Sequence, residues 1–123
     1  MEFEELTRKI IGASIDVHKI LGPGLLESAY EECLFYELTQ QGLRVERQKP
    51  VPIVYKEIKL DYGYRIDLLV EDTVIIELKS IDAFAPIHEA QILTYMKFAN
   101  KKIGLLMNFN VTVLKNGLKR YVL

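Results

Sequence analysis

The sequence predicts an α+β domain in which helices cover a mixed β-sheet, a three-layer α/β/α arrangement. Three observations predict it: helical spacing of apolar residues in the N-terminal third, strand-like alternation in the middle, and a further helix followed by strands. With 123 residues, 50% of them hydrophobic, the chain has the size of one compact domain, residues 1–123. It contains no linker, internal repeat or low-complexity tract that would divide it.

Two helices are expected before the sheet. From Phe3 to Leu21 the apolar residues recur every three or four positions, which describes one stripe of an amphipathic helix, and Gly22-Pro23-Gly24 ends it. A second helix is predicted from Leu26 to Gln41, with Gly42 as its C-terminal cap. The next segment, Val45 to Tyr55, has an extended pattern, and its two prolines would remove ladder donors and so indicate an edge strand or a break.

The central hairpin carries the most informative charges. Its predicted strands, Tyr64–Val70 and Val74–Lys79, close around residues 71–73. Their alternation predicts a register with three apolar pairs: Ile66 with Leu78, Leu68 with Ile76, and Val70 with Val74. The same register places Asp67 opposite Glu77, with Lys79 on the face of Glu77. Directly opposed residues have Cβ atoms about 5 Å apart, so the two carboxylates must share a proton, bind a cation or cost stability. A divalent metal is the simplest resolution.

After the hairpin, Pro86 is predicted to begin a third helix that runs to about Asn100. Residues Lys102 to Phe109 then form a buried strand. The dipeptide Asn116-Gly117 favours a type I′ turn, so a last hairpin is predicted between residues 111–115 and 118–122.

The overall composition limits the class of protein. Lys and Arg total 16 against 17 Asp and Glu, so the formal charge of −1 provides no global attraction to nucleic acid or to an anionic membrane. The single cysteine, Cys33, excludes an intramolecular disulfide or a cysteine zinc cluster. The acidic N-terminus does not resemble a signal peptide, and no apolar run approaches the length of a membrane span. We therefore expect a soluble, cytoplasmic protein.

Five basic residues of the second strand region allow two interpretations: Arg44, Arg47, Lys49, Lys56 and Lys59. They form a stripe that follows phosphates, or they protect an edge strand from pairing with other chains. His18 and His88 are lone histidines on predicted helices, and neither is assigned to a site.

An acid on one strand, Glu-x-Lys on the next, and then a helix and a further strand resemble the PD-(D/E)XK nuclease superfamily through Asp67, Glu77 and Lys79. Ile66 takes the place of the proline in that name. The helix after this core contains Gln91 and Tyr95 one turn apart, and this Q-x-x-x-Y is similar to the accessory motif of the RecB-like and lambda-exonuclease-like branch.

A third motif narrows the resemblance. Residues Gly24 to Tyr30 read G-x-x-E-x-x-Y, with Glu27 as the acid, which is the signature of the GxxExxY family. The similarity to that family extends over essentially the whole chain. It implies a restriction-endonuclease-like fold, in which a mixed β-sheet is flanked by helices.

The resemblance also implies a metal site. Asp67 and Glu77, with the backbone carbonyl of Leu78, would hold one or two Mg²⁺ or Mn²⁺ ions, which are hard cations that prefer oxygen ligands. Glu27 would add a further carboxylate. Such a metal activates water and offsets charge on the phosphate in the transition state.

The same resemblance implies roles for three further side chains. Lys79 would orient or deprotonate the attacking water and stabilise the phosphate. Gln91 and Tyr95 would position Lys79 or a phosphate oxygen. Their spacing of one turn on a predicted helix places both on the same face of that helix.

Three hypotheses follow. The first is a metal-dependent nuclease that acts on DNA rather than RNA, without sequence specificity because the chain has no separate recognition module. The second is a non-catalytic or partner-dependent accessory subunit that keeps the nuclease fold and binds nucleic acid with a protein partner. The third is a structural domain in which Asp67 and Glu77 pair with Lys79 and Arg65 in a buried network. A homodimer formed through the terminal strand, residues 118–123, fits all three.

Overall fold

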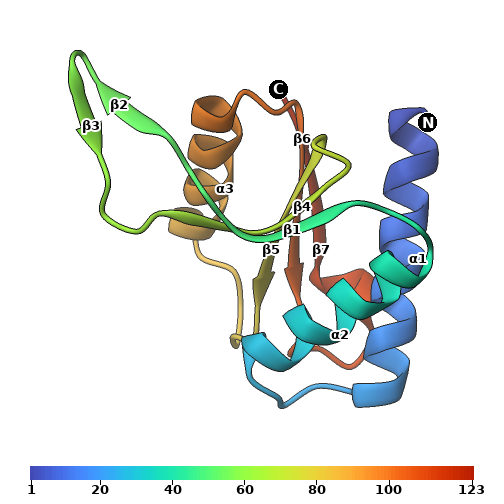
Figure 1. Cartoon of the computed structure of the whole chain (residues 1–123). Helices are drawn as coiled ribbons and strands as arrows, with labels where there is room; N and C mark the ends of the chain where they lie inside the picture. Colours follow the sequence, from blue (N-terminus) through green and yellow to red (C-terminus); the bar gives the residue numbers. More distant parts are fainter.

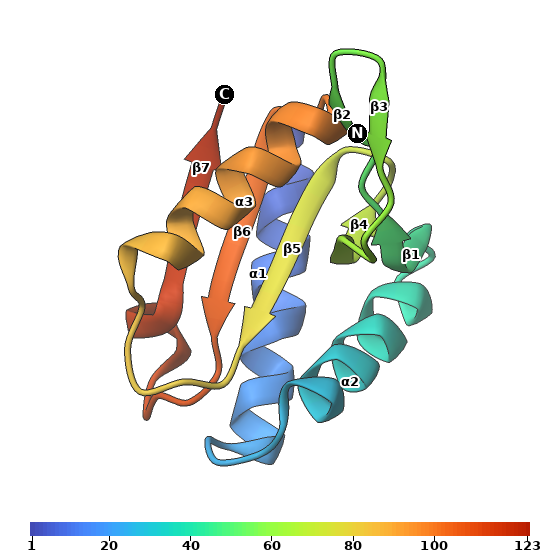
Figure 2. The ribbon, with the colours of Figure 1, turned by 90° about the vertical axis from the view of Figure 1, so that its left-hand side faces the viewer.

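Three layers make up the structure. The computed structural model describes residues 1–123. Helices α1 (Phe3–Leu21) and α2 (Glu27–Gln40) lie on one face of a five-stranded sheet, and α3 (Pro86–Ala99) lies on the other. Figures 1 and 2 show this arrangement from two directions, with α3 in front of the sheet and α1 behind it in Figure 2. The predicted α+β class and α/β/α layering are confirmed.

The sheet is mixed. Its strands are β1 (Val45–Pro50), β4 (Arg65–Val70), β5 (Val74–Lys79), β6 (Ile103–Asn108) and β7 (Leu118–Val122), in the order β1-β4-β5-β6-β7. Strands β5 and β6 are parallel, and α3 forms the crossover between them, whereas the other neighbours are antiparallel. Strand β1 is an edge strand that ends at Pro50, as its prolines predicted.

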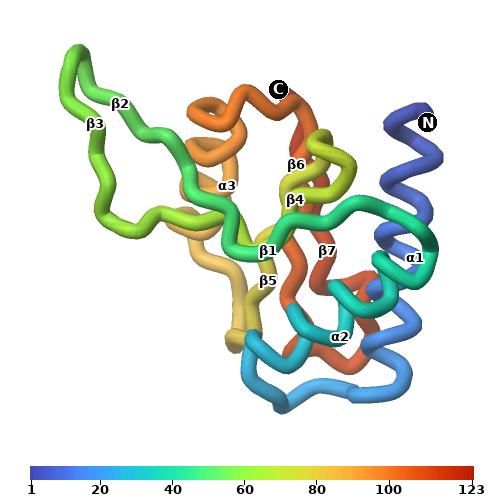
Figure 3. The backbone as a smooth tube through the Cα atoms, in the orientation of Figure 1, coloured from blue at the N-terminus to red at the C-terminus, as the bar shows by residue number.

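The two strands β2 (Ile53–Tyr55) and β3 (Ile58–Leu60) form a separate two-stranded sheet. They project from the body of the protein as an arm, which is easiest to follow in the tube of Figure 3. The prolines of this segment predict the break before β2, but nothing in the sequence predicts β3, because three residues are too few to show a clear alternation.

Apolar side chains fill both sides of the sheet. On the α1 and α2 side, 18 buried residues form one cluster, in which the rings of Tyr30 and Phe109 stack at 4.5 Å between centroids. On the α3 side, 8 buried residues form a second cluster. Burial on both faces explains why β5 and β6 are apolar except at Glu77, Lys79 and Asn108, near the ends of the two strands.

Helix boundaries agree closely with the sequence. The first helix has the predicted bounds, and the second begins and ends one residue inside them. Gly42 has φ 80° and its N–H donates to the carbonyl of Thr39, while the N–H of Leu43 donates to the carbonyl of Leu38. These two bonds form a Schellman motif, which confirms Gly42 as the residue that terminates the helix.

The predicted hairpin at Asn116-Gly117 is wrong. These residues belong to a 3-10 helix, Leu114–Gly117, and β7 pairs with β6 instead of with residues 111–115. An isolated two-stranded hairpin is marginal in water, whereas β6 offers a buried strand with an open edge. The dipeptide signal was overridden because Leu114 reaches the core and β7 gains a five-residue ladder.

Gly117 lies at a position that has no room for a side chain. A Cβ atom there would overlap the backbone carbonyl oxygen of Asn108. We expect Gly117→Ala to lower the free energy of unfolding by about 2–4 kcal/mol, because backbone rather than a flexible side chain must move. The matched control is Gly12→Ala in α1, where nothing lies within 4 Å and alanine should stabilise by up to about 1 kcal/mol. Urea unfolding of both variants measures the two effects, and equal stabilities would contradict this explanation.

Candidate active site

The site begins where β4 and β5 separate. The predicted register is confirmed at Leu68–Ile76 and Val70–Val74. The third predicted pair, Ile66 with Leu78, is wrong, because Ile66 packs on the α3 side of the sheet and Leu78 on the α1 and α2 side, and the paired ladder ends at Leu68–Ile76. Beyond it, the N–H of Asp67 donates to Glu77 Oε1 at 3.3 Å, and the N–H of Leu78 donates to Asp67 Oδ2 at 2.8 Å. The two carboxylates thus replace backbone ladder bonds, and the structure brings Asp67 and Glu77 together as the alternation predicted.

Burial dominates the electrostatics of this pair. Glu77 is only 4% exposed, and burial, followed by the charge of Asp67, raises its pKa to about 9. Burial also raises the pKa of Asp67, and the N–H of Leu78 opposes that rise. Without a cation, the two carboxyl groups therefore share a proton at neutral pH.

Lys79, Gln91 and Tyr95 form a chain of polar contacts on the α3 side of the sheet. Lys79 Nζ donates to Gln91 Oε1 at 3.5 Å, and Gln91 Nε2 donates to the Tyr95 hydroxyl at 3.3 Å. Burial, followed by the charge of Glu77, raises the pKa of Tyr95. The Q-x-x-x-Y residues of α3 thus contact Lys79, the positioning that the resemblance implied, over distances that are long for hydrogen bonds.

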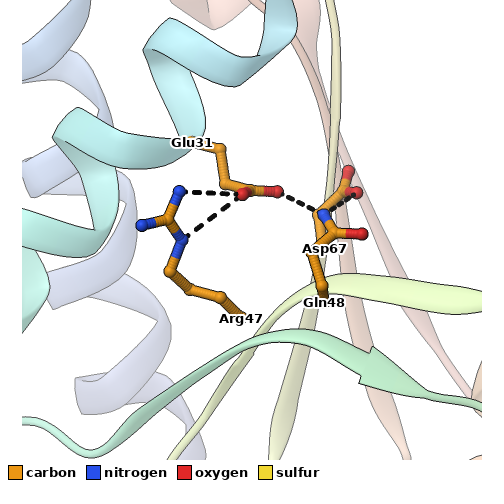
Figure 4. Close-up of polar contacts among 4 residues, drawn as sticks. All are labelled: Glu31, Arg47, Gln48 and Asp67. Carbon is orange, nitrogen blue, oxygen red and sulfur yellow. Dashed lines mark hydrogen bonds and ion pairs between the residues drawn. The ribbon is translucent and has the colours of Figure 1, made fainter.

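A second polar network lies on the α2 side and was missed from the sequence. Figure 4 shows Glu31 between Arg47 and Gln48. Arg47 Nη2 donates to Glu31 Oε2 at 3.1 Å, and Gln48 Nε2 donates both to Glu31 Oε1 at 2.6 Å and to Asp67 Oδ1 at 3.3 Å. Gln48 therefore links the buried carboxylate of Glu31 to Asp67.

The backbone at Gln48 explains how its side chain reaches both acids. Its φ is 50°, the left-handed region that is uncommon for a residue other than glycine. The β1–β4 ladder runs through Arg47–Leu68 and Lys49–Ile66 and omits Gln48 between them. Nothing in the alternation of β1 predicts such a conformation, because it depends on contacts with α2 and β4.

Glu27 lies in the wall of a pocket of about 300 Å³ that also contains Glu31, Gln48, Asp67 and Leu78. It is exposed and forms no hydrogen bond with Asp67. Glu31 follows it by one helical turn on the same side of α2, so the i, i+4 spacing was the signal that could have found Glu31. The structure brings Glu27 to the site without joining it to the carboxylate pair.

The remaining residues of G-x-x-E-x-x-Y shape the loop before α2. Gly24 has φ 97°, which a side chain would strain. The buried Tyr30 hydroxyl donates to the carbonyl of Gly22 at 2.6 Å and accepts from the N–H of Leu25 at 3.1 Å. The motif therefore fixes the loop from which Glu27 begins the helix.

We expect Tyr30→Phe to lower the free energy of unfolding by about 1–3 kcal/mol, because it leaves the carbonyl of Gly22 and the N–H of Leu25 without their partner. Tyr36→Phe is the control, since Tyr36 is 59% exposed and its hydroxyl forms no hydrogen bond within the protein. Guanidinium unfolding provides the measurement. A Tyr30→Phe protein as stable as the control would show that the loop does not depend on this hydroxyl.

The buried charge network of the third hypothesis is not formed. Neither Asp67 nor Glu77 is in a salt bridge, and Arg65 is exposed. The two histidines have local roles, since His18 Nε2 contacts the carbonyl oxygen of Val111 and His88 Nδ1 accepts from the N–H of Ala85. Neither histidine lies in the site.

Three of the five basic residues in the β1 region have acidic partners within the protein. The pairs are Arg44 with Glu71, Arg47 with Glu31, and Lys49 with Glu46. Lys56 and Lys59 lie instead on the β2–β3 arm and form no salt bridge. The five residues thus do not form a continuous stripe of free charge along β1.

The donor set fits a magnesium ion with few protein ligands. No group of three or more His, Cys, Asp or Glu side chains converges to hold a metal. Mg²⁺, however, is usually held by one or two carboxylates, with water and substrate phosphates completing its octahedron. The adjacent carboxylates of Asp67 and Glu77, whose raised pKa values a nearby cation would lower, are donors of that kind.

A family model for the PD-(D/E)XK nuclease superfamily matches residues 4–121. The chain belongs to this superfamily. The comparisons with curated proteins and with solved structures found no match. Membership of this nuclease superfamily indicates a nuclease-like function and binding of nucleic acid, and PD-(D/E)XK nucleases generally use divalent metals such as Mg²⁺. None of its helices is both long and apolar enough to span a membrane.

Proposed function

We propose that this PD-(D/E)XK protein is a Mg²⁺-dependent deoxyribonuclease of the GxxExxY type that hydrolyses phosphodiester bonds in DNA without sequence specificity. The observation that carries the proposal is the meeting of Asp67 and Glu77 where β4 and β5 separate. Burying two adjacent carboxylates destabilises a protein unless a cation or a proton compensates, so the arrangement indicates a functional site.

In the proposed mechanism, Asp67, Glu77 and the backbone carbonyl of Leu78 would hold Mg²⁺ or Mn²⁺. When bound, the ion supplies positive charge that activates water and offsets the charge of the phosphate. The ammonium of Lys79 donates hydrogen bonds to the attacking water or to a phosphate oxygen. Gln91 restricts where that ammonium lies, because its Oε1 accepts from Nζ.

Residues on the α2 side of the site would orient the carboxylate of Asp67. Gln48 donates to Asp67 Oδ1 and leaves Oδ2 to the N–H of Leu78, so the orientation of this carboxylate is fixed from both sides. Glu31 holds Gln48 in place, and Glu27 adds negative charge to the open wall of the pocket. Partners that orient metal ligands in this way typically change metal affinity by 10–100-fold when they are removed.

A second candidate function is a nucleic-acid-binding subunit that depends on a protein partner. The observation that favours it is the charge distribution: the formal net charge is −1, and the basic residues in β1 and directly before it already pair with Glu31, Glu46 and Glu71. A partner would then supply most of the contacts with phosphate.

The homodimer stays a prediction. Strand β7 is at the edge of the sheet, so a second copy of the chain could pair with it, and light scattering tests whether the protein is a dimer.

The deciding experiment incubates the purified protein with single-stranded, linear duplex and covalently closed DNA, and with RNA, in Mg²⁺, in Mn²⁺ and in EDTA. We expect metal-dependent cleavage of DNA, faster on single strands and ends than on closed duplex. Thermal shift with the same metals is measured in parallel. A metal-dependent rise in melting temperature without cleavage would favour the partner-dependent subunit. Absence of both effects would overturn the nuclease proposal.

A further inference from the structure

We propose that the β2–β3 arm, with the segment that joins it to β4, binds an unpaired strand of the substrate by stacking its bases on exposed tyrosines. This inference rests on the proposed function and names the substrate class: single strands, frayed ends or flaps rather than intact duplex. The tyrosines are Tyr55 on the arm and Tyr62 and Tyr64 in the joining segment.

The arm presents aromatic and aliphatic surface that the fold does not use. Tyr55 is 59% exposed, Ile58 is 59% exposed and Tyr62 is 79% exposed. Tyr55 and Ile58 are directly opposed in the hairpin, so they form one apolar patch near its tip. Figure 1 shows this tip pointing away from the helices and from the main sheet. A folded monomer gains nothing from placing these side chains there.

The base of the arm is fixed to the body. The N–H of Val51 donates to the carbonyl of Tyr64 at 3.0 Å, which ties the beginning of the arm to its end. Ile53 packs against the core on the α3 side, and with Leu60 it lines a hollow of about 540 Å³ between the arm and the body. A fixed arm loses little entropy on binding, and the hollow is large enough to receive an unstacked base.

The joining segment leads directly to the candidate active site. Tyr64 immediately precedes β4, the strand that carries Asp67. A strand stacked on Tyr62 and Tyr64 would therefore be led toward the carboxylates of Asp67 and Glu77.

The positive charge of residues 49–65 favours the binding of a polyanion such as a nucleic acid. Residues 49–65 contain four basic and two acidic side chains, a net charge of +2 within a chain whose formal charge is −1. Lys56, Lys59 and Arg65 form no salt bridge, and Lys56 Nζ lies 5.5 Å from the centroid of the Tyr55 ring. Free basic groups interleaved with exposed aromatic rings are the pattern by which proteins bind single-stranded nucleic acid, with phosphates on the cations and bases on the rings.

The test measures binding without cleavage. Ca²⁺ replaces Mg²⁺, and the anisotropy of a fluorescein-labelled single-stranded oligo(dT) reports the Kd of wild type, Tyr55→Ala, Tyr62→Ala and the double variant. We expect each single change to raise Kd by about tenfold, in the range measured for loss of one stacked base. Kd for a duplex of the same length should change by less than about twofold. Tyr36→Ala, which removes an equally exposed tyrosine from α2, should leave both values unchanged.

The outcomes separate this inference from the proposed function. If wild type cleaves DNA and the arm variants bind oligo(dT) as tightly as wild type, the arm inference is overturned and the nuclease proposal stands. If wild type cleaves nothing but binds oligo(dT) in a manner that requires Tyr55 and Tyr62, the arm inference stands and the nuclease proposal fails. If wild type does not bind oligo(dT), or if the arm variants lose only self-association in light scattering, the arm is not a strand-binding surface.

Discussion

Replacing Asp67 with asparagine is expected to lower Mg²⁺-dependent cleavage of DNA by at least about a hundredfold without unfolding the protein. Asparagine keeps the side-chain oxygen that can accept from the N–H of Leu78, but it removes the negative charge that a metal requires. Cleavage rates for wild type and variant under saturating Mg²⁺, with circular dichroism to establish folding, provide the measurement.

A control separates the loss of this charge from a general effect of removing an acid. Asp16→Asn removes an exposed carboxylate from α1, on the opposite side of the sheet from α3, and should cleave at the wild-type rate. The rise in melting temperature caused by Mn²⁺ should disappear only in Asp67→Asn, since a ligand that binds the folded state alone stabilises it. If Asp67→Asn cleaves as fast as wild type, Asp67 does not hold the metal.

Local signals were sufficient for most of the fold. The bounds of α1 and α2 follow from apolar spacing and from Gly42, whose positive φ and backbone bonds are local properties. The hairpin at Asn116-Gly117 could not be rejected from the sequence, because the competing partner, β6, is brought into place by the α3 crossover. The preference of Asn116-Gly117 for a hairpin turn is therefore outweighed by the hydrogen-bonded ladder that β7 forms with β6, a buried strand.

The same distinction applies to the candidate site. Asp67 and Glu77 were found because their meeting follows from the register of one hairpin. Glu31 and Gln48 were not found, because their contact depends on how α2 packs beside β1 and on the unusual backbone of Gln48. Sequence patterns thus identified the residues of the strand pair but not the network that orients Asp67 from the neighbouring helix.

Replacing Glu77 with glutamine is expected to change the free energy of unfolding in opposite directions in the absence and in the presence of metal. In metal-free protein, Glu77→Gln is expected to raise the free energy of unfolding at neutral pH by about 3 kcal/mol. Its folded pKa of about 9 lies above the ordinary value of 4.5, so the unfolded chain releases this proton first. Glu77 therefore causes wild type to lose stability as pH rises from 4.5 toward 9, whereas glutamine, which imitates the protonated acid, does not titrate.

Urea unfolding in EDTA, near the bottom and near the top of that pH window, measures the difference. The two proteins should have similar stability at the acidic end, where Glu77 is protonated in the folded protein and only about half ionised in the unfolded chain, and Glu77→Gln should be the more stable at the basic end. Glu57→Gln, which alters an exposed acid in the turn of the arm, should follow wild type throughout. A wild type whose stability does not fall with pH relative to Glu77→Gln would show that Glu77 is ionised at little cost.

Added Mg²⁺ should reverse the order of stability at the basic end of the window. Wild type can then exchange the proton of Glu77 for a divalent ion and gain binding free energy, whereas glutamine offers a neutral and much weaker ligand. The cost of burying Glu77 beside Asp67 would thus appear only in the absence of the cation. Such a reversal is expected of a metal site and not of a structural hydrogen bond, because a structural bond would stabilise wild type equally in EDTA and in Mg²⁺.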